Sequence, residues 1–277
     1  MNVIPAISAE TVSRFTTAEL RRNFLLESLF VPNKVELNYW ETDRTIVGSA
    51  VPVATPLKLE ASKKELAADY FLERREIGIL NIGGAGVVEV EGTAYPMSKL
   101  DCLYVGRGVK SVIFKSNNAS DPARFYLLSY PAHATYPTVL AKQADATAVH
   151  LGSSETANER TIYKYIHSDG VKSCQLVMGI TCMKPGSIWN TMPSHTHLRR
   201  SEAYLYFDID PAHRIIHLMG EPSETRHLVV ADGQAILSPV WSIHSGAGTA
   251  SYSFCWGMGG ENQDFNDMDG FPIADLR

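Results

Sequence analysis

Helical periodicity is strong only near the beginning of the chain. Residues 20–30, LRRNFLLESLF, place their apolar side chains at helical spacing. Thr16 is followed three residues later by Glu19, a spacing that is typical of the capping box at the start of a helix. The pattern predicts one short amphipathic helix near the N-terminus.

From about Val35 onward the pattern is that of a β protein. Short runs rich in Val, Ile, Tyr, Phe and Thr are separated by Gly, Pro, Asn and Asp, which is typical of many antiparallel strands. In the segment GVVEVEGTAYPM, Glu91 and Gly92 separate two such runs and predict a hairpin turn. We therefore expect a mainly β chain built from sandwich or jelly-roll barrels.

An internal repeat suggests two such barrels in tandem. The segment LERRE that ends at Glu76 resembles LRRSE, which ends at Glu202, at an offset of 126 residues. Residues 106–111 and 239–244 match at an offset of 133, each before another strand-like run. Chance similarity among β segments is the alternative. The polar, alanine-rich residues 138–159 are the expected linker, which gives a first half of residues 1–140 and a second half of residues 141–277.

Composition and charge narrow the range of partners. The chain has 277 residues, 45% of them hydrophobic, and a net charge of −5 without a long basic run, so neither nucleic acid nor an anionic membrane is an expected partner. No apolar stretch approaches the roughly 18 residues of a membrane span, and the N-terminus lacks the order of a secretion signal. We expect a cytoplasmic protein that binds a small molecule.

The cysteine pattern indicates core thiols. Cys102, Cys174, Cys182 and Cys255 form no C-x-x-C pair and lie in apolar segments. Buried free cysteines behave as small hydrophobic residues. The sequence therefore predicts neither a disulfide framework nor a cysteine zinc site.

Histidines and one glutamate form the strongest chemical signal. His195 and His197 are two residues apart, so on a strand both imidazoles point to the same face. Glu202 reaches that face only if the LRRS spacer forms a turn, and His244 is a candidate fourth ligand. Three imidazoles and a carboxylate suit Zn, Fe, Mn or Ni. Surface or hydrogen-bonded core histidines are the alternative interpretation.

These spacings resemble the two motifs of the cupin superfamily, H-x-H-x4-E and G-x5-P-x4-H, although Trp241 replaces a usual glycine of the second motif. The first half has the same outline without the histidines. Asp69, Phe71 and Ser111 fall at the ligand positions and only Glu76 remains. We therefore expect a bicupin whose N-terminal half binds no metal.

A closer resemblance covers nearly the whole chain. The segments FLERREIGILNIGGAG, PAHATYPT, NTMPSHTHLRRSEAYLYF, SPVWSIHSGAGT and WGMGGENQDFNDMD are similar to those of the 5-keto-4-deoxyuronate isomerases. The resemblance implies one zinc ion per subunit, a homo-hexamer, and a place in the bacterial breakdown of pectin-derived uronates. It also implies an aldose-ketose isomerisation that converts 5-dehydro-4-deoxy-D-glucuronate to 3-deoxy-D-glycero-2,5-hexodiulosonate.

Further candidate residues come from the segments that carry this resemblance. Metal ligands are unavailable as free bases, so the candidates for moving a proton are Lys164, Arg226 and Glu261 or Asp264. The candidates for contacting the substrate are Arg160, His133 and Tyr136. An acidic sugar needs local positive potential, so at least one of Arg160, Lys164 and Arg226 is expected to face the metal. Arg199 and Arg200 are expected to serve the turn or a subunit contact.

Two other functions use the same ligands. A cupin dioxygenase would hold Fe and keep positions open for O₂. A noncatalytic sugar-binding or regulatory cupin would bind uronates without turnover, although the chain shows no DNA-binding helix-turn-helix pattern. The isomerase interpretation accounts for the family resemblance as well as for the ligands.

Overall fold

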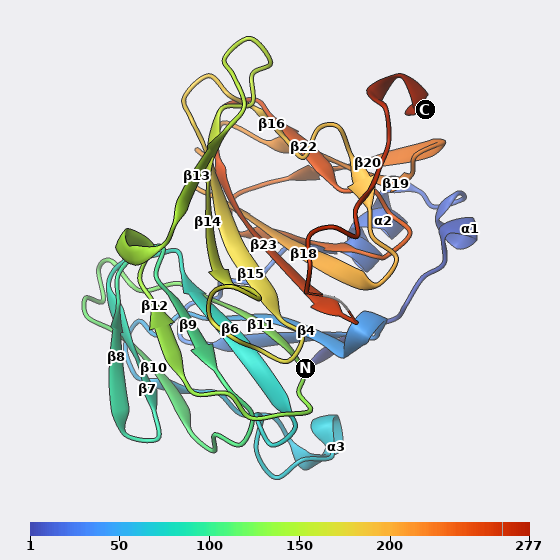
Figure 1. Ribbon diagram of the computed structural model, residues 1–277. Helices are drawn as coiled ribbons and strands as arrows, with labels where there is room; N and C mark the ends of the chain where they lie inside the picture. Colours follow the sequence, from blue (N-terminus) through green and yellow to red (C-terminus); the bar gives the residue numbers. More distant parts are fainter. Residues whose placement is uncertain (262) are drawn as a thin grey trace. The chain divides into compact units, whose positions relative to one another are not determined.

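The computed structural model describes residues 1–261 and 263–277, which form two compact units (Figure 1). The first unit consists of Met1–Ile4, Leu29–Ala146 and Tyr165–Met178. The second consists of Pro5–Ser28, Thr147–Lys164 and Gly179–Arg277. Both are built almost entirely from antiparallel strands, so the mainly β fold class expected from the sequence is confirmed.

Helices are few and short. The described residues contain α1 (Ala9–Val12), α2 (Thr17–Phe24) and α3 (Lys63–Leu66), with 3₁₀ turns η1 (Thr42–Arg44), η2 (Gln143–Asp145) and η3 (Ile273–Asp275). The predicted capping box begins α2: the Glu19 amide donates to Thr16 Oγ1, and the Thr16 amide donates to the Glu19 carboxylate at 2.7 Å. Leu20 and Phe24 form the buried face of α2. None of these helices is long and apolar enough to cross a membrane.

The first unit packs a seven-stranded sheet against a four-stranded sheet. The larger sheet has the order β1 (Asn2–Ile4), β3 (Val35–Trp40), β4 (Thr45–Ala50), β11 (Phe125–Pro131), β6 (Arg75–Asn81), β9 (Cys102–Val105) and β12 (Val139–Ala141). The smaller sheet has the order β5 (Leu57–Lys58), β10 (Val112–Ser116), β7 (Gly86–Val90) and β8 (Thr93–Met97). Apolar side chains of both sheets, including Ile77, Ile79, Val88 and Phe114, form one core.

The second unit repeats this arrangement. Its larger sheet has the order β13 (Ala148–Leu151), β14 (Arg160–Ile166), β15 (Val177–Met183), β23 (Ser253–Gly260), β18 (Arg200–Phe207), β21 (Gln234–Ser238) and β2 (Leu25–Leu26). The smaller sheet has the order β16 (Trp189–Asn190), β22 (Ser245–Gly248), β19 (Ile215–Glu221) and β20 (Glu224–Val230). A further pair joins β17 (His195–Thr196) to β24 (Asp269–Gly270). Figure 1 shows β14, β15, β23 and β18 side by side.

The hairpin predicted from the sequence joins β7 to β8. Val90 pairs with Thr93, which leaves Glu91 and Gly92 as a two-residue turn. Both turn residues have positive φ, 49° and 85°, as the twist of a two-residue hairpin favours. The prediction of a turn at these two residues is confirmed.

The segment expected to be a linker carries strands of its own. Within residues 138–159, β12 pairs with β9, and β13 pairs with β14. The boundary expected between residues 140 and 141 falls inside β12. The segment therefore adds one edge strand to each of the two seven-stranded sheets.

All four cysteines are free thiols. Cys102 and Cys255 are fully buried, whereas Cys174 and Cys182 are partly exposed. Burial raises the pKa of the Cys102 thiol well above its usual range, so its reactive thiolate form is suppressed. The expectation of core thiols therefore holds for Cys102 and Cys255 and is wrong for Cys174 and Cys182.

We expect that an aromatic disulfide reagent modifies at most two thiols of the native protein, Cys174 and Cys182. Released thiolate is measured by absorbance, first in buffer and then in guanidinium chloride, where all four thiols should react. Rapid reaction of three or four thiols in buffer would mean that the cores around Cys102 and Cys255 are open.

Candidate metal centre

A turn between two strands brings the first three predicted ligands together. His195 lies in β17, His197 follows that strand, and Glu202 lies in β18. The His197 Nδ1 atom is 2.7 Å from the carbonyl oxygen of Arg200, so Nδ1–H donates to this carbonyl and leaves Nε2 with a free lone pair. This local contact closes the turn and directs the His197 ring toward Glu202.

The fourth predicted ligand comes from the smaller sheet. His244 directly precedes β22, and its Nε2 atom is 3.1 Å from His195 Nε2 and 3.2 Å from Glu202 Oε2. His197 Nε2 is 3.0 Å from the same Glu202 oxygen. The three histidines form a group that is able to hold a metal ion. In a tetrahedral site with bonds of about 2.0–2.2 Å, neighbouring ligand atoms lie roughly 3.3–3.5 Å apart. The four donor atoms therefore fit one metal ion.

The electrostatics of the cluster also suit a cation. Burial tends to raise the Glu202 pKa, but the charge of His244 and the hydrogen bond from His197 outweigh it and lower the pKa to about 2. Burial lowers the pKa values of His195 and His244. At neutral pH Glu202 is thus an ionised carboxylate beside the neutral imidazoles of His195 and His244. Burial tends to lower the His197 pKa, but the hydrogen bond with Glu202 outweighs it and raises the pKa. A metal ion would displace this proton, because histidine binds metals in its neutral form.

Aromatic side chains surround the cluster inside the barrel. The Tyr204 ring lies 5.4 Å from the His244 ring and stacks on Phe254 at 5.3 Å. Tyr206 Oη is 2.7 Å from His217 Nδ1, and burial lowers the His217 pKa to about 3. These rings fill the space below the ligands and exclude water from that side.

A cavity of about 430 Å³ opens beside the cluster. His195 and Glu202 form part of its wall, and Trp256 and Phe265 give it an apolar side. Its basic residues are Arg160, Lys164 and Arg200. A small anion with hydroxyl and carbonyl groups fits a cavity of this size and charge.

Five of the residues singled out from the sequence lie outside the wall of this cavity, the exposed Asp264 among them. Arg226 is on the edge strand β20, where its Nη2 donates to the carbonyl of Ser13 and to Glu224. Glu261 is exposed just after β23, and His133 and Tyr136 belong to the first unit. Arg226 is therefore held by the N-terminal segment and is not in the wall that was expected to include it.

Arg200 is the cavity residue that the sequence interpretation missed. It is fully buried, donates from Nη2 to Asp267 at 2.7 Å, and lies 5.4 Å from the Phe265 ring. Its Nε and Nη1 atoms have no hydrogen-bond partner among the described residues. Arg200 and Glu202 are two residues apart on one strand, so the alternation that placed His195 and His197 together would have placed Arg200 on the inner face as well. The sequence assigned Arg200 to the turn or to a subunit contact. Its carbonyl does close the turn, and its guanidinium lines the cavity as well.

The repeat also misassigned Glu76. On β6, Ile77 and Ile79 point into the core, so Glu76 points to the opposite face. Its carboxylate accepts hydrogen bonds from Tyr104 Oη and from the backbone amides of residues 174–176 at 2.7–2.9 Å. Glu76 is a structural residue on the outside of the barrel and not the remnant of a metal site.

Two other residues of the first half that align with the predicted ligands also have structural roles or partners of their own. Phe71 is buried in the apolar core, and Asp69 is exposed and pairs with Lys63 at 2.8 Å. Among the described residues, the group formed by His195, His197 and His244 is the one His/Cys/Asp/Glu cluster with metal-ligand spacing.

The two-layered β units and the histidine cluster define a protein of the cupin fold. An IolB-like protein from Salmonella typhimurium aligns with a TM-score of 0.70 and 13% identity over 90% of this chain and 97% of its own. Oxalate decarboxylase from Lactobacillus farciminis aligns with a TM-score of 0.60 and 10% identity over 90% of this chain and 88% of its own. These structures share the fold of this chain.

Sequence comparison identifies the family. The model of the KduI/IolB family matches residues 26–270. The 4-deoxy-L-threo-5-hexosulose-uronate ketol-isomerase of Halalkalibacterium halodurans is 53% identical over 98% of both chains. The protein of the same name from Lachnoclostridium phytofermentans is 53% identical over the full length of both. This chain belongs to the KduI/IolB family.

Proposed function

We propose that this protein is a metal-dependent ketol-isomerase that converts 5-dehydro-4-deoxy-D-glucuronate to 3-deoxy-D-glycero-2,5-hexodiulosonate. The observation that carries the proposal is a buried cluster of three imidazoles and one carboxylate at the wall of a basic cavity. Full-length relatives at 53% identity, named for this reaction, identify the substrate.

The reaction moves a carbonyl group from C1 to C2. In the enediol route, the proton on C2 is removed, a proton is added to C1, and the C2 hydroxyl proton passes to the C1 oxygen. In the alternative route, a hydride moves from C2 to C1, and the C2 hydroxyl proton again passes to the C1 oxygen. A metal ion held by His195, His197, Glu202 and His244 would supply electrostatic stabilisation of the negative charge that develops on the two oxygens.

Lys164 is the candidate we propose for moving the proton. Side chains that bind the metal are not available as free bases, so we propose a separate group as acid or base. Lys164 lines the cavity, and its Nζ lies 4.6 Å from the centre of the Phe265 ring. The other candidates, Arg226, Glu261 and Asp264, lie outside the cavity wall.

Arg200 and Arg160 are the residues we propose for the substrate carboxylate. Both line the cavity, and Arg200 has two nitrogen atoms free of described hydrogen bonds. A planar guanidinium pairs with a carboxylate through two parallel hydrogen bonds. This pairing would fix the acidic end of the sugar and place its carbonyl end toward the ligand cluster.

We expect Arg200→Gln to raise KM for the uronate by roughly 10- to 100-fold, because a hydrogen bond to a charged group contributes about 1.5–3 kcal/mol. Steady-state kinetics measure the change, and a substrate analogue without the carboxylate should be affected much less. Arg199→Gln, which removes an exposed charge next to it, is the matched control. Equal effects on the acid and the neutral analogue would assign the carboxylate to other groups.

Zinc is the metal that we propose, with one ion per subunit and none in the N-terminal barrel. Nitrogen and oxygen donors in a four-ligand set suit zinc, and Fe, Mn and Ni accept the same donors. We further propose a homo-hexamer in the cytoplasm, as the family resemblance implies. Sedimentation equilibrium measures the assembly, with the mass of six 30.5 kDa chains as the expected result.

Anaerobic turnover tests the proposed activity. The purified protein is incubated with 5-dehydro-4-deoxy-D-glucuronate under nitrogen and under air, and the diulosonate is measured by chromatography. Equal rates are expected, because isomerisation consumes no oxygen. A requirement for oxygen would identify a dioxygenase, and binding without product would identify a noncatalytic sugar-binding protein.

A further inference from the structure

The first unit contains a cavity of its own, larger than the one beside the histidines. Its volume is about 780 Å³, and its wall comes from β1, β3, η1, α3, the start of β6 and the end of β11. It lies at the start of β6, beside Glu76, the residue that the sequence repeat aligns with Glu202 of the histidine cluster. The described residues place no histidine in this wall.

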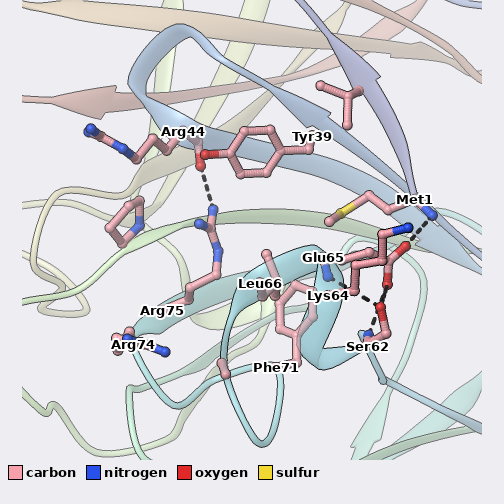
Figure 2. Close-up of a pocket in the computed structure, with 13 residues that line it drawn as sticks. Met1, Tyr39, Arg44, Ser62, Lys64, Glu65, Leu66, Phe71, Arg74 and Arg75 are labelled. Carbon is pink, nitrogen blue, oxygen red and sulfur yellow. Dashed lines mark hydrogen bonds and ion pairs between the residues drawn. The ribbon is translucent and has the colours of Figure 1, made fainter.

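Basic side chains dominate the charge of this cavity. Arg44, Arg74, Arg75 and Lys64 all line it, and Glu65 is the acidic residue in its wall. The Glu65 carboxylate is already satisfied by the N-terminal ammonium group at 2.6 Å and by the amide of Ser62. Figure 2 shows these contacts at one side of the cavity, away from Arg75. The cavity therefore carries a positive charge that its own residues leave uncompensated.

Arg75 is the buried centre of this charge. It is 6% exposed, and its guanidinium is held by protein oxygens: Nε donates to Ser129 Oγ, and Nη2 donates to the carbonyls of Ser129 and Arg44 at 2.8 and 2.6 Å. Figure 2 shows Arg75 reaching from its strand to the Arg44 carbonyl. These hydrogen bonds leave Nη1 for a ligand. Burial lowers the Arg75 pKa to about 10, so the arginine still carries its charge at neutral pH.

The remaining wall is apolar. Tyr39, Leu66 and Phe71 face the same space as Arg75 (Figure 2). A cavity that combines a fixed guanidinium, further exposed cations and apolar surface suits an organic anion rather than an inorganic ion, because the apolar surface needs carbon atoms to cover it.

We propose that this cavity in the N-terminal unit is a second ligand site, which binds a small organic acid through its carboxylate. Arg75 holds the carboxylate, Arg44 and Arg74 add attraction at the rim, and Phe71 and Tyr39 contact the carbon chain. Sugar acids, whether free monosaccharide uronates or the substrate and product of the proposed reaction, share this chemistry. The site lacks metal ligands among its described residues, so it binds and does not isomerise.

The test measures binding of D-galacturonate to the metal-loaded protein by isothermal titration calorimetry, with D-galactose as the neutral match. The double variant Arg44→Gln/Arg74→Gln removes two exposed charges of the rim and should fold normally, and Lys34→Gln removes an exposed charge outside the cavity. We expect the wild type to bind one galacturonate per chain in addition to any bound beside the histidine cluster. The double variant should bind this galacturonate at least tenfold more weakly, and Lys34→Gln should bind it as the wild type does.

Each other outcome contradicts the proposal. Equal binding by the double variant and the wild type would place the anion elsewhere, and equal binding of galactose would mean that charge is not recognised. Binding of inorganic phosphate in place of galacturonate would mean an inorganic anion site. Arg75→Lys provides a second test at the centre of the cavity, since it keeps the positive charge and removes the planar guanidinium that pairs with a carboxylate through two hydrogen bonds. This binding assay does not depend on turnover, so its result stands apart from the outcome for the proposed isomerase.

Discussion

His244→Ala is expected to reduce bound metal from about one ion per chain to background and to lower kcat/KM by more than 100-fold. His244 Nε2 lies within 3.2 Å of both His195 Nε2 and Glu202 Oε2, so the substitution removes one of the four proposed metal-binding atoms. Loss of a residue that merely supports a metal ligand costs 10- to 100-fold in affinity or activity, and loss of a ligand costs more. Elemental analysis after dialysis and steady-state kinetics give the two numbers.

The matched control is His227→Ala, which removes an exposed imidazole from β20. It should keep both metal and activity. His244→Ala should still unfold cooperatively, because apolar packing rather than the ion stabilises a barrel of this size. Unchanged metal content would remove His244 from the site, and loss of cooperative unfolding would make the site structural.

The second large effect concerns stability. Glu76→Ala is expected to lower the free energy of unfolding by about 3–5 kcal/mol, because it leaves Tyr104 Oη and three backbone amides without their acceptor in a buried position. Urea denaturation measures the change. The folded protein should keep its metal, since Glu76 lies on the outer face of its strand in the first unit, away from the histidine cluster.

Glu89→Ala is the control for this experiment. Glu89 also lies on a strand of the first unit, but its carboxylate pairs with the partly exposed Lys115, and such surface pairs contribute about 0–1 kcal/mol. A destabilisation by Glu76→Ala that is no larger than that of Glu89→Ala would contradict the buried hydrogen-bond network. Loss of metal at wild-type stability would restore Glu76 as a ligand.

Local sequence was sufficient to predict that His195, His197 and Glu202 lie close together. Strand alternation alone predicts that the side chains of His195 and His197 lie on the same face. A hydrogen bond from His197 to the Arg200 carbonyl closes the turn that brings Glu202 to the same place. The hairpin at Glu91 and Gly92 is equally local, because the turn needs only two residues with positive φ. The antiparallel β class follows from the same short-range patterns.

Features that depend on which face a strand presents were harder to predict. An offset of 126 residues aligns Glu76 with Glu202, but the inner face of β6 carries Arg75, Ile77 and Ile79. A shift of one residue moves every side chain of a strand to the other face, and the alignment of two short segments does not resolve such a shift. Arg75 was overlooked for this reason.

The roles of the basic residues were hard to predict, because their hydrogen-bond partners lie far away in the sequence. Arg226 was singled out for its charge, yet Ser13, far away in the sequence, accepts its hydrogen bond. Arg200 was expected to serve the turn or a subunit contact, because only the folded barrel brings Asp267 and Phe265 close to its guanidinium. Contacts of this kind depend on how the strands are ordered in the sheets, and the local sequence pattern does not predict that order.

The central claim is that one metal ion, bound by the histidine cluster of the second unit, is required for isomerisation. The most direct measurement titrates metal-free protein with Zn²⁺ and records bound metal and the rate of diulosonate formation in the same samples. The account predicts that activity rises linearly and stops rising at one equivalent per chain. Full activity without metal, or a rise that continues to two equivalents, would contradict it.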